Sequence, residues 1–99
     1  DDFYLNTLNK VLPDLINRIE PDFIFYLAGV DILKNDKLGR LSMSLDGCKQ
    51  RDKIVIDLCK KMKIPIQISM GGGYSSSIDE IVEAHCNTFV TAQEIFFNK

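Results

Sequence analysis

Residues 23–43 read FIFYLAGVDILKNDKLGRLSM, a run of apolar side chains that passes directly into a polar segment. Residues 23–27 are five apolar side chains in a row, which predicts a strand covered on both faces, as in a parallel sheet between helical layers. Ala28 and Gly29 end this strand, because small residues let the backbone turn sharply. Asp31 is therefore expected just beyond the carboxyl end of the strand, where open α/β sheets place their ligands.

Helices are predicted on both sides of this strand. Leucine and isoleucine recur at helical spacing from residue 3 to residue 19, with a kink or restart expected at Pro13. After the strand, residues 32–45 fit neither period and predict a long loop of the kind that usually carries function. Ser44 or Asp46 then caps a second helix. Its apolar face is made by Ile54, Val55, Leu58, Cys59 and Met62.

A second strand and a third helix complete the pattern. Pro65 opens the strand at residues 66–70, GGGYSSS follows, and Ser77 with Glu80 has the form of a capping box. One stripe of the last helix is expected to face inward, so its histidine is expected to be a structural, half-buried one. That stripe consists of Ile78, Val82, His85, Phe89, Ala92 and Phe96.

The order strand, helix, strand predicts a βαβ unit, which is parallel and right-handed in nearly every known case. Parallel strands end at the same edge of a sheet, so the Asp31 loop and the loop at residues 71–74 should open into one crevice. If the two strands are neighbours, they lie roughly 5 Å apart. Side chains from both loops could then contact one substrate.

Composition excludes some classes of partner. The net charge is −2, with lysine and arginine spread among carboxylates, so no direct nucleic-acid ligand is expected. No apolar run approaches the roughly 18 residues of a membrane-spanning helix. Cys48, Cys59 and Cys86 lack C-x-x-C spacing, which favours reduced structural thiols in a cytoplasmic protein, or a nuclear one in a eukaryote.

The length of 99 residues allows about two strands and three helices. That is too little to cover both faces of a strand as apolar as residues 23–27. The chain also begins at Asp1 and opens directly into a helical pattern. We therefore expect it to be part of a larger α/β enzyme.

Two segments, AGVDILKNDKLGRLS at residues 28–42 and GGGYS at residues 71–75, resemble the C-terminal part of the histone deacetylase family, most closely its bacterial and class IV-like branches. The resemblance covers about residues 21–92. It implies the three-layer α/β/α, parallel-sheet arginase/deacetylase fold, with residues 1–99 as the C-terminal part of a single deacetylase domain. It also implies a zinc-dependent amide hydrolase that removes acetyl or other acyl groups from protein lysine side chains or from related acetylated amines.

The resemblance assigns roles to five residues. Asp31 corresponds to a zinc ligand, Leu38 lines the substrate channel, and Gly72 and Gly73 let the backbone pass close to the substrate. Tyr74 corresponds to the tyrosine that donates a hydrogen bond to the acyl carbonyl oxygen. The other two zinc ligands belong to an upstream Asp-x-His segment that this sequence lacks. The chain alone is therefore expected to be inactive and to need the rest of the domain as its partner.

Taken without the resemblance, these residues have other interpretations. Asp31 could be a turn or capping aspartate, and Tyr74 an aromatic packing lid. Residues 71–73 could form a flexible tether or an anion-binding nest before a helix. The alternative function is a non-catalytic βαβ module that binds an anion or another protein.

Overall fold

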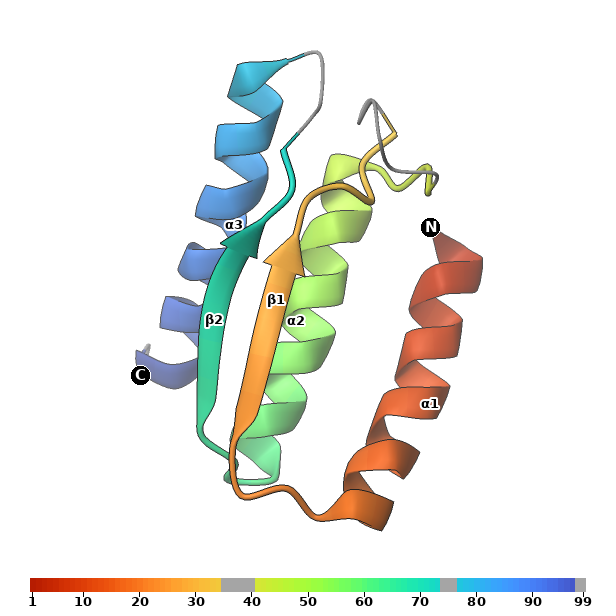
Figure 1. Ribbon diagram of the computed structural model, residues 1–99, viewed down its shortest axis with the longest axis vertical. Coiled ribbons are helices and arrows are strands. Elements are labelled where there is room, and N and C mark those ends of the chain that lie inside the picture. Colours follow the sequence, from red (N-terminus) through yellow and green to blue (C-terminus); the bar gives the residue numbers. More distant parts are fainter. Residues whose placement is uncertain (35–40, 74–76, 98–99) are drawn as a thin grey trace.

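The computed structural model describes residues 1–34, 41–73 and 77–97. Along these residues the chain forms α1 (Asp2–Ile19), β1 (Ile24–Gly29), α2 (Leu45–Lys61), β2 (Ile66–Gly71) and α3 (Ile78–Phe97), as Figure 1 shows. The predicted α/β class and the predicted order of elements are confirmed. No helix in the described part of the chain is both long enough and apolar enough to cross a membrane.

The two strands are parallel neighbours, with Ile24 opposite Ile66 and Gly29 opposite Gly71. Helix α2 connects them from behind the sheet in Figure 1, and β2 lies to the left of β1. This is the right-handed βαβ unit that the sequence predicts. Both strands therefore end at the same edge of the sheet.

Only one face of the sheet is covered by described residues. Helices α2 and α3 lie behind it, and α1 stands beside α2 (Figure 1). On the open face Phe23, Phe25 and Leu27 are 47%, 75% and 75% exposed. The described helices supply a single layer, so this chain does not by itself cover both faces of β1, as its length predicts.

A hydrophobic cluster lies beneath the carboxyl end of β1. It is a cluster of buried side chains from the β1 loop, α2 and α3, consisting of Val30, Ile32, Leu33, Met43, Cys48 and Ala84. The two ends of the predicted long loop meet there, since Met43 N donates to Ile32 O at 2.9 Å and Lys34 N donates to Met43 O at 2.9 Å. The base of the loop is thus fixed on the core.

Local signals at the helix ends agree with the prediction. Ser44 is the N-cap of α2, and its hydroxyl accepts from Gly47 N at 2.9 Å. Ser77 Oγ accepts from Glu80 N at 3.2 Å at the start of α3. Helix α1 ends at Ile19, with Glu20 as its C-cap before Pro21, but it is one continuous helix through Pro13 and does not restart there.

The predicted inward stripe of α3 is wrong for three of its six residues, whereas His85, Ala92 and Phe96 are partly buried. Ile78, Val82 and Phe89 are 76%, 53% and 45% exposed. The buried side chains of α3 are the small ones, Ala84, Thr88 and Thr91. Small side chains let α3 lie close against α2, and this close packing turns the larger apolar residues of α3 away from the described core.

Two substitutions test this one-sided core. Ile56→Ala removes a side chain with 0% exposure and should lower the free energy of unfolding by about 2–5 kcal/mol. Leu27→Ala on the open face should change the free energy of unfolding by no more than about 0.5 kcal/mol. Urea unfolding of the 99-residue chain measures both. Equal losses would mean that the open face of the sheet is covered in solution.

Candidate functional site

The two predicted loops meet at the carboxyl edge of the sheet. Beyond the last strand pair, Val30 N donates to Gly71 O at 3.0 Å. The parallel ladder therefore continues by one hydrogen bond into the β1 loop. Asp31 follows Val30 directly, so this hydrogen bond fixes the backbone next to Asp31.

Gly72 lies against Asp31. A Cβ on Gly72 would be 3.0 Å from Asp31 N and 3.1 Å from Asp31 Cβ, and Gly72 has φ 72°. Both the close approach and the left-handed backbone favour glycine at this position. The structure thus brings together the carboxylate loop and the glycine loop, as the βαβ geometry predicts.

The carboxylate of Asp31 is exposed at this edge. Its Oδ1 folds back over Gly29, where a Cβ would lie 2.8 Å away. Gly73, with φ 120°, packs toward α3, and a Cβ there would be 3.4 Å from Ile81 Cγ2. Asp31 therefore lies close to two glycines, Gly29 and Gly72, at positions where an added Cβ would crowd it.

The described residues do not form a complete metal site. Residues 1–34, 41–73 and 77–97 contain no group of three or more histidine, cysteine, aspartate or glutamate side chains that could hold a metal ion. A catalytic zinc takes three protein ligands. An exposed Asp31 fits the chemistry of one of them, and the other two would have to come from outside these residues.

Two of the predicted site residues, Leu38 and Tyr74, lie outside the described residues. Their roles in substrate binding and in oxyanion stabilisation stay predictions. Gly72 lies against Asp31 and Gly73 lies against Ile81 of α3, and the contact of both glycines with a substrate stays a prediction.

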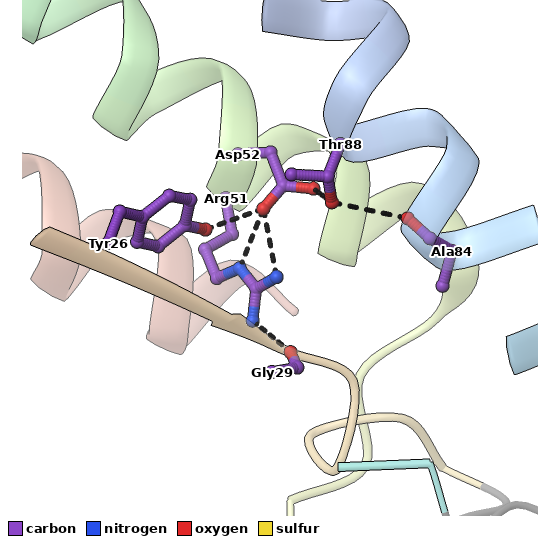
Figure 2. Close-up of polar contacts among 6 residues, drawn as sticks. All are labelled: Tyr26, Gly29, Arg51, Asp52, Ala84 and Thr88. Atoms are coloured by element: carbon purple, nitrogen blue, oxygen red, sulfur yellow. Dashed lines mark hydrogen bonds and ion pairs between the residues drawn. The ribbon is translucent and has the colours of Figure 1, made fainter. Parts of the chain in front are cut away.

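A buried polar network behind the site was missed by sequence reasoning (Figure 2). Asp52, at 0% exposure, accepts hydrogen bonds from Tyr26 Oη at 2.5 Å, Thr88 Oγ1 at 2.5 Å and Arg51 Nη2 at 2.8 Å. Arg51 Nη1 donates to Gly29 O at 2.6 Å. The network thus joins β1, α2 and α3 directly behind the end of β1.

A sequence signal for this network exists. Cys48, Asp52, Val55 and Cys59 repeat with helical spacing, and all four are buried. A charged residue within a buried stripe indicates a partner inside the protein. The predicted apolar face of α2 does not include Asp52, because only apolar residues define that face.

Burial sets the protonation of the neighbouring groups. Burial raises the pKa of Tyr26 far above its usual range, with a further contribution from Asp52, so the phenol stays protonated and donates. Burial raises the pKa of the Cys48 and Cys59 thiols. Both are free, buried thiols, whereas Cys86 is free and exposed. For His85 at the edge of the network, burial and the Arg51 charge lower the pKa.

Comparison with known proteins identifies the family to which the chain belongs. The profile of the histone deacetylase domain matches residues 1–89. The chain belongs to the histone deacetylase family. An uncharacterized protein of Picosynechococcus is 35% identical over 96 residues, which is 97% of this chain and 32% of that protein.

Two plant members of the histone deacetylase family are also similar. Histone deacetylase 2 of Arabidopsis thaliana is 35% identical over 82% of this chain and 21% of its own length. Histone deacetylase 9 of the same plant is 32% identical over 76% of this chain and 17% of its own length. The chain therefore spans about a third or less of the relatives that it matches.

The contact between Gly72 and Asp31 can be tested with a matched pair. Gly72→Ala places a Cβ 3.0 Å from Asp31 N at φ 72°, so it should destabilise the chain by about 1–2 kcal/mol. Gly71→Ala meets only Gly29 Cα at 3.7 Å and should change stability by less than about 1 kcal/mol. Urea unfolding compares the two. Equal effects would show that the glycine loop does not press on Asp31.

Proposed function

We propose that residues 1–99 are the C-terminal part of a single deacetylase domain. In this proposal the complete domain is a zinc-dependent amide hydrolase. Its substrates are acetylated or otherwise acylated lysine side chains of proteins, or related acetylated amines. The observation that carries the proposal is the contact of Gly72 with Asp31 at the carboxyl edge of a parallel sheet, in a chain that belongs to the histone deacetylase family.

Asp31 would be the ligand that this chain contributes to the metal. Zinc in such a site supplies Lewis acidity toward an acyl carbonyl. Two further ligands and a general base would come from the rest of the domain. The chain alone, with one carboxylate at the site, is expected not to hydrolyse an acyl-lysine.

The remaining residues of the chain would bind and orient the substrate. Gly72 and Gly73 carry no side chains, so an extended acyl-lysine arm could approach their backbone closely. Leu38 would line the channel for the alkyl part of that arm. Tyr74 would donate its phenolic hydrogen to the carbonyl oxygen, where negative charge develops in the transition state.

The open face of the sheet also supports the proposal that the chain is part of a larger domain. Phe25 and Leu27 are each 75% exposed, although strands with such residues are normally covered. The same face would serve the alternative function, a non-catalytic module that binds another protein. Metal content separates the two, since the hydrolase requires zinc in the complete domain and the module does not.

Asp31→Asn tests the metal ligand. An amide binds zinc more weakly than a carboxylate, so the variant of the complete domain should lose most of its zinc and most of its activity. Metal analysis after dialysis, together with turnover of an acetyl-lysine peptide, measures both. Asp14→Asn, a change at an exposed carboxylate on α1, is the control. Full zinc content and normal turnover in Asp31→Asn would show that Asp31 is only a turn residue.

Tyr74→Phe tests the oxyanion donor. Loss of one donor to a developing oxyanion lowers turnover by about 10² to 10³. Zinc content should stay the same because the phenol is not proposed as a ligand. Steady-state kinetics on an acetyl-lysine peptide, with zinc measured on the same sample, checks this. Turnover within a few fold of the parent would make Tyr74 a packing residue.

A further inference from the structure

The peptide that joins Gly29 to Val30 is held at both of its polar atoms. Its carbonyl, Gly29 O, accepts from Arg51 Nη1 at 2.6 Å. Its amide, Val30 N, donates to Gly71 O at 3.0 Å. One peptide plane therefore connects helix α2 on one side with the glycine loop on the other, and Asp31 follows it directly.

The guanidinium of Arg51 is itself held in a fixed direction. Its Nε and Nη2 donate to Asp52 Oδ1 at 3.1 and 2.8 Å, which leaves Nη1 for the Gly29 carbonyl (Figure 2). Tyr26 presents its ring to the guanidinium, with 5.6 Å from Arg51 Cζ to the ring centroid. Neighbouring residues on a helix normally point apart. The convergence of Arg51 on Asp52 is thus specific to this site.

Asp52 is held in turn from two other elements. Tyr26 Oη on β1 and Thr88 Oγ1 on α3 donate to its two carboxylate oxygens at 2.5 Å each. Arg51 and Asp52 are 5% and 0% exposed. A buried ion pair is weak evidence for stability, because apolar residues of similar size often serve as well. The hydrogen bond from Arg51 to Gly29 O indicates that this pair has a role other than stability.

We infer that Arg51 is a positioning residue, which fixes the Gly29–Val30 peptide and thereby the place of Asp31 against the glycine loop. Arg51 itself does not contact the site. The inference concerns the peptide and holds whether or not Asp31 binds zinc. Its consequence for metal affinity rests on the proposed function.

The test variant is Arg51→Lys in the complete domain. A lysine keeps the positive charge beside Asp52 but lacks the fork that reaches two acceptors in different directions. The matched control is Thr88→Val, which removes a hydrogen bond to Asp52 and leaves the contact of Arg51 with Gly29 O intact. Both changes touch the same network, so only the link to the peptide differs.

Hydrogen exchange on the zinc-free protein is the first measurement. The Val30 amide should exchange about tenfold faster or more in Arg51→Lys, relative to the Ile56 amide of α2, because a hydrogen bond to a charged group is lost. In Thr88→Val the ratio of the two rates should not change. The same ratio in both variants overturns the inference. If Arg51→Lys does not fold, the charge-neutral pair Arg51→Met with Asp52→Asn provides the same comparison.

Zinc affinity, measured by competition with a chelator, separates the inference from the proposed function. Loss of groups that orient a ligand typically weakens metal binding about 10- to 100-fold. Arg51→Lys should fall within or near that range, and Thr88→Val should not. Faster Val30 exchange with unchanged zinc affinity would support the positioning role of Arg51 and overturn the assignment of Asp31 as a ligand.

Discussion

The parallel pairing of β1 with β2 places both strand ends at one edge of the molecule. Its register sets Gly29 opposite Gly71, and the next hydrogen bond, from Val30 N to Gly71 O, extends the pairing into the loop. A shift by one residue would turn every side chain of a strand to the other face. It would also move Asp31 away from Gly72. The site geometry is thus a direct consequence of the strand register.

Much of this arrangement could be predicted because it depends on local signals. Five consecutive apolar residues before Ala28 indicate a strand, Ser44 and Ser77 cap helices, and strand–helix–strand order implies parallel pairing. From these alone the meeting of Asp31 with the glycine loop follows. The chemical roles of Asp31 and Tyr74 come from the family resemblance and not from the pattern.

The rest could not be predicted because an apolar pattern does not show which element packs against a given face of a helix. Ile78 and Val82 follow the helical period as well as any core residue, yet they are exposed, and α3 packs through Ala84 and Thr88. The side chain of Thr88 lies in the interior, where its hydroxyl donates a hydrogen bond to Asp52. A charged residue within a helix is normally solvated, so an apolar pattern leaves out Asp52, although its helical spacing from Cys48, Val55 and Cys59 places it on the buried side of α2.

The sheet has two strands among the described residues, so each of them is an edge strand. An edge strand presents unpaired backbone donors and acceptors that another strand can pair with. The open face of β1 also carries the exposed side chains of Phe25 and Leu27. Such a combination is a template for sheet extension. Without a covering segment, the same strand that orders the site would promote aggregation of the chain.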